Sequence, residues 1–161
     1  MVSLIAHNQV PRIFVDADAC PVKQEILTAA CELQAEVIMV ASYAHALGPY
    51  EGVTIIQVDQ ADQAVDLYIA NQLREGDIVI TQDFGVAALA LGKQAAAMSF
   101  RGQQYTHENI DYLLASRHAR SKARRAGMRT KGPRAMSDED RAVFLQHLTK
   151  LLRRRQENEI V

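Results

Sequence analysis

The stretch Ile13–Lys23, "IFVDADACPVK", joins a short apolar run to two carboxylates and then to a proline. The apolar run predicts a strand over 13–17, and Pro21 is typical of the first turn of a helix. Asp16 and Asp18 are therefore expected at the carboxyl end of the strand. Like charges this close together are unfavourable unless a positive group lies between them. The stretch thus predicts a strand that leads into a helix past a site for a cation.

Apolar runs rich in Val and Ile alternate with helical patterns through the first hundred residues. Two of the runs, "EVIMVA" and "DIVIT", are continuous, which is typical of strands covered by helices on both faces. The alternation predicts a parallel α/β sheet. Between these elements, residues 43–52 are expected to form a loop, and Gly76 is expected to end a helix. Strands are expected at 13–17, 36–42, 53–59, 77–82 and 95–100, and helices at 21–35, 61–75 and 85–92.

The remainder of the chain predicts helices. One is expected at about 106–126, and Ser137–Asp140 is typical of the start of a last helix. With 161 residues, 48% of them hydrophobic, the chain suits one compact domain. We therefore expect a single three-layer α/β domain over 1–161, with a central, mostly parallel sheet and C-terminal helices.

Charge divides this expected domain into two parts. Residues 1–100 contain 4 basic and 12 acidic residues, whereas residues 101–161 contain 14 basic and 7 acidic residues, so the two parts carry charges of −8 and +7. We expect an acidic α/β core at about 12–100 and a basic helical part at about 106–157.

The cysteines and the apolar segments bear on the cellular compartment. Cys20 and Cys31 are the only cysteines and form neither a CxxC nor a zinc pattern, so we expect a reducing compartment. No stretch approaches the roughly 20 apolar residues of a membrane span, and no targeting pattern begins the chain. We therefore expect a cytoplasmic protein that contacts no membrane. The expected role of Cys20 is packing.

Acidic residues gather where the parallel strands are expected to end. Asp16, Asp18 and Asp83 follow strands, and Asp62 and Asp66 fall in the first turns of the helix after the third strand. The ligand site of an open α/β sheet lies at this edge, because loops and helix N-termini converge there. Oxygen ligands without His or Cys favour Mg²⁺ or Mn²⁺. A simpler alternative is that Asp62 caps a helix or turns the chain.

A basic run that contains no acid extends from Arg117 to Arg134. Arg117, Arg120 and Arg124 share a helix face, and such a face can follow a phosphate backbone without reading its sequence. We expect nucleic acid as the partner of this run. The alternatives are a solvated connector and an arm that covers the acidic pocket. The expected contacts are Arg117, Arg120, Lys122, Arg124, Arg125, Arg129 and Lys131.

Five motifs together resemble the YaiI/YqxD family, uncharacterised bacterial proteins placed among the PIN-like domains. The motifs are "VDADACPVK" (15–23), "GDIVITQDFGVAALAL" (76–91), "RG" (101–102), "NIDYLL" (109–114) and "RTKGPR" (129–134). The resemblance covers about residues 12–150 and implies a PIN-like fold. It adds Arg101, in the "RG" motif, to the expected nucleic-acid contacts.

The resemblance also implies an activity. PIN-like nucleases carry an Asp after the first strand, an acid on a central helix and an Asp in a strand-end (S/T)xD motif, which Asp16, Asp66 and Thr81–Asp83 match. By resemblance, Asp16, Asp66 and Asp83 hold one or two divalent metals that activate water for phosphodiester cleavage, in particular of RNA. Asp18 is expected to support the metal or to orient the water.

This sequence departs from the PIN-like pattern at one place. Such nucleases often have a further acid soon after the strand-end Asp, whereas Phe84, Gly85 and Val86 follow here. Either Asp18 or Asp62 then completes the metal site, or the site is weak.

Two other functions are compatible with these residues. A strand followed by DxD also occurs in haloacid-dehalogenase-type phosphatases, in which the first Asp, here Asp16, is a nucleophile. Alternatively, a PIN-like domain with an incomplete acid cluster could bind RNA or a ribonucleoprotein without cleaving it. A trapped phosphoaspartyl intermediate would identify the phosphatase, and salt-sensitive binding without turnover would identify the binding module.

Overall fold

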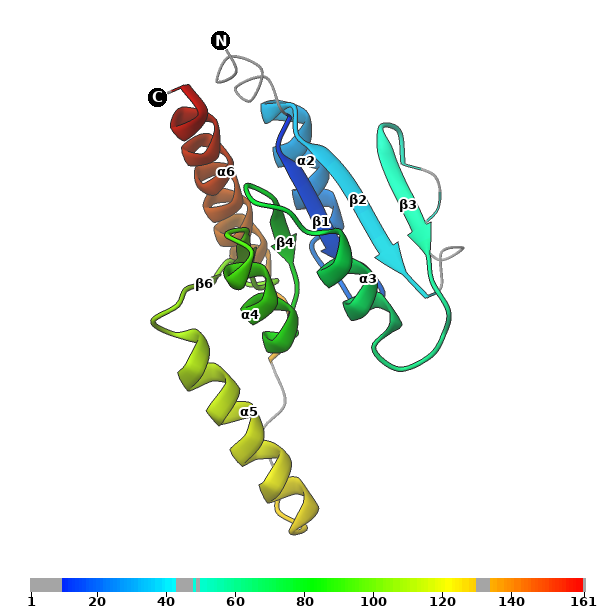
Figure 1. The fold of residues 1–161 in the computed structure, drawn as a ribbon, viewed down its shortest axis with the longest axis vertical. Helices are drawn as coiled ribbons and strands as arrows, with labels where there is room; N and C mark the ends of the chain where they lie inside the picture. The colour runs from blue at the N-terminus through cyan, green and yellow to red at the C-terminus, as the bar shows by residue number, and fades with distance from the viewer. Residues whose placement is uncertain (1–9, 43–47, 49, 130–133, 161) are drawn as a thin grey trace.

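The computed structural model describes residues 10–42, 48, 50–129 and 134–160. Six strands form one sheet in the order β3-β2-β1-β4-β5-β6, with helices on both faces (Figure 1). This confirms the expected α/β fold with a mostly parallel central sheet and C-terminal helices. The strands are β1 (Arg12–Asp16), β2 (Glu36–Ala41), β3 (Val53–Gln57), β4 (Ile78–Ile80), β5 (Ala96–Met98) and β6 (Gln104–Tyr105), and the helices are α2 (Lys23–Leu33), α3 (Ala64–Gln72), α4 (Phe84–Gly92), α5 (Ile110–Arg125) and α6 (Asp138–Ile160).

The order in which the chain adds strands to the sheet reverses at β1. Neighbouring strands pair in parallel except β5 and β6, which are antiparallel. Ile13 in β1 lies opposite Val37 of β2 on one side and Ile78 of β4 on the other. The chain thus adds β2 and β3 on one side of β1 and then crosses to β4. Ligands of open α/β sheets bind at such a switch point, outside the carboxyl ends of the strands.

Alternate residues of each strand face two separate cores. Ile13 and Val15 pack toward α2 and α6, whereas Phe14 packs toward α3 and α4. In α6, Phe144 and Leu148 are fully buried against the first core. Each such side chain contributes about 1.5–3 kcal/mol on burial. The three layers therefore depend on strands that are apolar on both faces, as the continuous runs predicted.

The region around α3 differs from expectation in two details. The helix begins at Ala64, because Gln63 adopts a left-handed backbone with φ 65°. Asp62 therefore precedes the helix and does not share a helix face with an acid inside it. The helix also ends at Gln72, so Gly76 is not its stop; Gly76, with φ 89°, belongs to the turn before β4.

Several element ends also differ from the predicted ones. β6 was not predicted, and the helix expected from 106 begins at Ile110. The strands expected at 77–82 and 95–100 contain three residues each: β4 ends before Thr81, which turns toward the acids described below, and β5 ends before the turn at Ser99–Gly102. Pro21 precedes α2 rather than lying in its first turn. In the loop expected at 43–52, the described positions 48 and 50–52 form no helix or strand.

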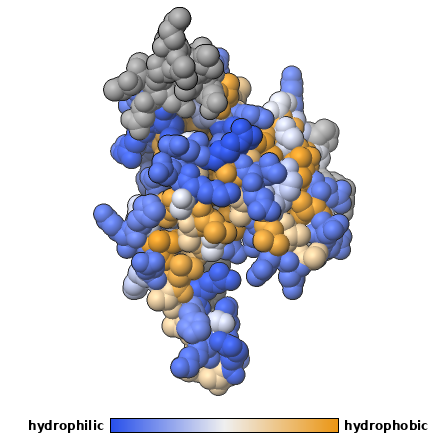
Figure 2. All heavy atoms as spheres, viewed as in Figure 1, coloured by the Kyte–Doolittle hydropathy of each residue, from blue (hydrophilic) through white to orange (hydrophobic). Residues whose placement is uncertain are grey.

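The surface combines apolar patches with a hydrophilic projection. On the face shown in Figure 2, hydrophilic side chains cover most of the far end of α5, and apolar residues gather over α4. Leu89 of α4 is 54% exposed. None of the described helices is both long and apolar enough to cross a membrane.

Candidate functional site

Three of the predicted acids meet between β1 and β4. Asp16 is the last residue of β1, Asp83 follows β4 as the N-cap of α4, and Asp66 lies in the first turn of α3. The Asp66 carboxyl lies within hydrogen-bonding reach of Asp83, and the charge of Asp16 acts on it as well. The sheet therefore brings the three acids together at its switch point.

Thr81 connects two of these acids. Its hydroxyl lies 3.2 Å from Asp16 Oδ2, to which it donates, and accepts the backbone N–H of Asp83 at 3.0 Å. The Tyr105 hydroxyl donates to the Thr81 carbonyl at 3.1 Å. Thr81 is fully buried, so its side chain has few alternative positions. The threonine of "TQD" thus fixes the distance between the ends of β1 and β4.

The Asp83 carboxylate is held from two sides. Its Oδ1 accepts the backbone N–H of Val86 at 3.0 Å, and Nη1 of Arg117 in α5 lies 3.8 Å from the same oxygen. A Cβ at Gly85 would stand 3.0 Å from this oxygen, so glycine leaves room for the carboxylate. Asp83 is therefore both a structural cap and a member of the acid cluster.

Burial and mutual repulsion disfavour negative charge in this cluster. Burial raises the pKa of Asp16, the Thr81 hydroxyl opposes this shift, and the charges of Asp18 and Asp83 add to it. Burial, followed by Asp83 and Asp16, raises the pKa of Asp66 to about 6, while Arg117 acts in the opposite direction. A cation among the three carboxyls would reverse these shifts.

Asp66→Asn should raise the melting temperature at pH 7.5 by about 2 °C, because an amide removes the cost of a repelled, half-buried charge. The folded pKa lies above the ordinary value of 3.8, so the folded state binds more protons between about pH 4 and 6. Wild-type stability therefore falls as pH rises through this window, and the variant's advantage disappears near pH 4. Thermal unfolding in EDTA at pH 4.5, 6 and 7.5 measures this.

The control for this experiment is Asp62→Asn, an amide substitution at an exposed acid in the turn before α3. It should change the melting temperature little at any of the three pH values. If the melting temperatures of Asp66→Asn and wild type were equal at all three pH values, the repulsion described above would be contradicted.

The two other predicted acids have different surroundings. The exposed Asp18 carboxylate accepts the Ser42 backbone N–H at 3.0 and 3.1 Å and the Ser42 hydroxyl at 2.5 Å, which ties the loop after β1 to the end of β2. Asp62 lies in the exposed turn before α3. The catalytic role of Asp18 and the metal-binding role of Asp62 stay predictions.

The donor atoms of the cluster suit a hard divalent cation, but their present arrangement is open. Asp16, Asp66 and Asp83 offer only oxygen ligands, which Mg²⁺ and Mn²⁺ prefer. Across the described ranges, no three His, Cys, Asp or Glu side chains already form a group that could hold a metal ion. A bound cation would have to draw the three carboxylates closer together.

The basic helix α5 lies at the end of the molecule toward which the parallel strands point (Figure 1). Arg117, Arg120 and Arg124 are exposed on it, and the helical spacing predicted for them is confirmed. The other predicted phosphate contacts in this region are also exposed, namely Lys122, Arg125 and Arg129, whereas Lys131 lies outside the described residues. Phosphate binding by these residues stays a prediction.

Arg101 lies outside α5, in the turn between β5 and β6. Its guanidinium donates to Asp140 Oδ2 at 2.9 Å and to the backbone carbonyl of Arg134, and Arg134 Nη2 donates to Asp140 Oδ1 at 3.1 Å. Sequence analysis missed this cluster because its members are far apart along the chain. The one local signal was the Ser137-x-x-Asp140 spacing, which places an acid at the start of α6.

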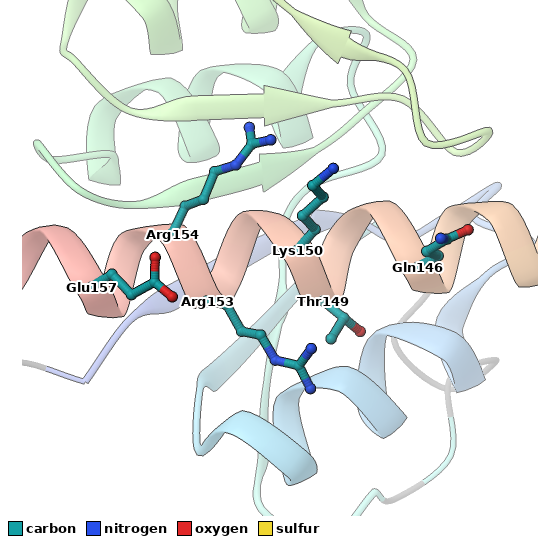
Figure 3. Close-up of a pocket in the computed structure, with 6 residues that line it drawn as sticks. All are labelled: Gln146, Thr149, Lys150, Arg153, Arg154 and Glu157. Carbon is teal, nitrogen blue, oxygen red and sulfur yellow. The ribbon is translucent and has the colours of Figure 1, made fainter.

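A separate cavity of about 550 Å³ lies along α6 (Figure 3). Arg153 extends toward α2, where its Nη2 lies 3.3 Å from Glu32 Oε1, whereas Lys150 and Arg154 extend toward the sheet. None of the predicted acids lines this cavity, so it is separate from the site between β1 and β4. Its lining residues are Gln146, Thr149, Lys150, Arg153, Arg154 and Glu157.

The fold and the site define an α/β protein with an acid cluster at the switch point of its sheet and a basic helix beside it. The chain belongs to the family described as "Uncharacterized BCR, YaiI/YqxD family", whose model matches residues 14–154. This confirms the family indicated by the motifs, while the placement among PIN-like domains stays a prediction.

Individual relatives cover most of this chain. It is 48% identical to a UPF0178 protein of Bacillus velezensis, over 87% of this chain and 84% of that protein. It is 46% identical to one of Halalkalibacterium halodurans, over 92% and 94% of the two chains, and 43% identical to one of Listeria monocytogenes, over 89% and 96%. No solved structure matches this chain.

Proposed function

We propose that the protein is a metal-dependent nuclease that hydrolyses phosphodiester bonds in RNA. The observation that supports this most strongly is the convergence of Asp16, Asp66 and Asp83 at the switch point, where Thr81 links Asp16 to Asp83 and the charges of both act on Asp66. Acids that only stabilise a fold have partners that favour their charge, as Asp77 has in Arg12 at 2.6 Å. A cluster that disfavours its own charge is typical of a functional site.

Each neighbouring residue then has a defined part in the chemistry. A divalent ion held by Asp16, Asp66 and Asp83 would activate water and stabilise charge on the phosphate oxygens. Thr81 keeps Asp16 in place, and the N-cap bond to Val86 does the same for Asp83. The Arg117 guanidinium lies beside Asp83 and can move to bind a phosphate group when a substrate binds.

The position of α5 favours a polymeric substrate over a small phosphoester. Its exposed arginines, from Arg117 to Arg125, span about two helical turns or about 12 Å, which is farther than one phosphate group reaches. Contacts of this kind follow a backbone and bind irrespective of sequence. In a haloacid-dehalogenase-type phosphatase, the second Asp of the DxD motif, here Asp18, would be the general acid. Three hydrogen bonds from Ser42 engage the Asp18 carboxylate instead.

The combined variant Arg117→Gln, Arg120→Gln and Arg124→Gln should weaken RNA binding similarly for all sequences. Each lost phosphate contact reduces the slope of log K against log salt by about 0.7–0.9, so the slope should fall by about 2. Filter binding between 50 and 300 mM KCl measures this. The variant Arg153→Gln on α6 is a matched control, because that arginine pairs with Glu32 and lies outside the proposed interface. An unchanged slope in the triple variant would exclude α5 as the interface.

The decisive test of the activity is RNA cleavage with purified protein. End-labelled single-stranded RNA, structured RNA and matching DNA are incubated with Mn²⁺, with Mg²⁺ and with EDTA. Cleavage of RNA that requires the metal and an intact Asp83 supports the proposal. Metal-independent cleavage, or none at all, contradicts it.

A second candidate function is RNA binding without cleavage. The open arrangement of the acids favours it, since no metal-holding group of three stands ready within the described residues. Salt-dependent RNA binding by wild type and Asp83→Asn alike, with no turnover by either, would establish this function instead.

A further inference from the structure

A cavity of about 450 Å³ opens beside Asp16. Its volume falls within the roughly 300–1,000 Å³ of pockets that hold small ligands. Most of the wall is apolar, although the cavity borders the acid cluster. The apolar residues come from the turn before α2, the turn after β5 and the segment before α6, namely Ala19, Pro21, Phe100 and Met136.

Two arginines in the same wall are fixed by one carboxylate. Arg101 and Arg134 both donate to Asp140, at 2.9 and 3.1 Å. Asp140 in turn accepts the Ser137 backbone N–H and donates its own N–H to the Ser137 hydroxyl, both at 3.1 Å. This capping box fixes Asp140 at the first turn of α6. The Arg101 guanidinium, which also donates to the Arg134 carbonyl, therefore stands at the cavity with little side-chain entropy left to lose on binding.

The turn that carries Arg101 is pressed against α6. Gly102 has φ +83°, and a Cβ there would stand 3.1 Å from the Cα of Phe144 and 3.1 Å from His147 Nδ1. His147 Nδ1 also lies 2.8 Å from the Gly102 carbonyl oxygen. Any other residue at 102 would push the turn away from the helix, and Arg101 with it. The "RG" dipeptide thus positions a guanidinium at the cavity wall.

Gln82 separates this cavity from a second one. It lines both the cavity beside Asp16 and another of about 390 Å³ that contains Asp83, Phe84 and Arg117. The side-chain Oε1 of Gln82 accepts the Phe100 backbone N–H at 2.9 Å, and its amide NH₂ group is of a type that can donate to a ligand. Each cavity therefore combines one acid of the cluster with arginine and a shared amide donor.

We propose that the cavity beside Asp16 receives one unstacked base of a single-stranded nucleic acid, next to the phosphate bound at the acid cluster. This inference rests on the proposed function, because it places the substrate at the same acids. The apolar wall accepts the faces of the base, the Gln82 amide donates to its edge, and Arg101 or Arg134 binds a flanking phosphate. A base paired within a duplex cannot enter, so the cavity selects single strands.

The test is to fill the cavity with Ala19→Leu, a substitution in the exposed turn after β1 that leaves the acids and the arginines in place. Fluorescence anisotropy in EDTA compares single-stranded RNA with a blunt duplex of the same sequence. Wild type should prefer the single strand about tenfold, the effect of one stacked base. Ala19→Leu should lose this preference. Ala61→Leu, at an exposed position ahead of α3, is the matched control and should keep it.

A second measurement needs no variant. A short RNA in which one nucleotide is abasic should bind wild type about tenfold more weakly when the gap falls at the cavity, and equally well at other positions. Equal binding at every position, together with wild-type behaviour of Ala19→Leu, would overturn the proposed cavity.

The two proposals can fail separately. If Ala19→Leu loses the preference in EDTA while wild type shows no metal-dependent cleavage, the base cavity is supported and the nuclease activity is refuted. If wild type and Ala19→Leu cleave and bind RNA alike, the nuclease stands and the base cavity is refuted.

Discussion

Asp83→Asn is expected to reduce metal-dependent RNA cleavage at least about a hundredfold, because loss of a direct metal ligand exceeds the 10- to 100-fold effect typical of the residues behind one. The substitution separates chemistry from structure. Asparagine is as good an N-cap as aspartate, and its Oδ1 can keep the Val86 N–H bond that Asp83 accepts at 3.0 Å. Initial rates on end-labelled RNA with Mn²⁺, for both proteins purified in parallel, measure the effect.

A thermal readout accompanies the rate measurement. Saturating Mn²⁺ should raise the melting temperature of wild type, since a ligand at about 100 times its Kd adds about 2.7 kcal/mol of stability. Asp83→Asn should lose most of this increase. Asp83→Ala should in addition melt lower without metal, because it loses a cap worth about 1 kcal/mol. Equal cleavage by wild type and Asp83→Asn would mean that a contaminating nuclease is responsible, and the enzyme assignment would fall.

The parallel core could be predicted because its strands leave a continuous signal in the sequence. In β2, Glu36–Ala41, every position after the first is buried, so the run contains no polar residue that could disguise it. β6 gives no such signal, because it contains only Gln104 and Tyr105. It is a strand because it pairs with the distant β5, and the ring of Tyr105 packs against Phe84 with its centroid 5.8 Å away. The start of α3 likewise depends on a left-handed Gln63, which its residue type does not indicate.

The acid cluster could be predicted from the sequence, whereas the cavity beside it could not. Asp16 and Asp83 could be placed because each follows a strand, and parallel strands end at one edge. The cavity depends on contacts between distant segments, such as the bond between Arg101 and Asp140, which are 39 positions apart. Arg134 was seen only as part of a charged run. Its role requires knowing that α6 returns across the sheet to the β5–β6 turn.

Phe144→Ala is expected to destabilise the fold by about 3–5 kcal/mol, the usual cost of removing a buried aromatic side chain. Phe144 is fully buried in the core between the sheet, α2 and α6. Natural domains are stable by only about 5–15 kcal/mol, so the loss is a large fraction of the total. Urea unfolding followed by circular dichroism measures it, and the melting temperature should fall by roughly 10 °C. Tyr112→Ala removes an aromatic side chain that is 73% exposed and should cost less than about 0.5 kcal/mol.

The same substitution tests whether α6 supports the site at a distance. Phe144 packs beneath the β5–β6 turn, and Asp140, one helical turn earlier, holds Arg101 and Arg134 at the cavity. A loosened α6 should therefore weaken the preference for single-stranded RNA at temperatures well below melting, while the cap between Asp83 and Val86, on the other face of the sheet, stays intact. Hydrolysis of bis(4-nitrophenyl) phosphate should then fall less than RNA binding does. Equal losses in both would show that α6 stabilises the whole fold without a particular effect on the cavity.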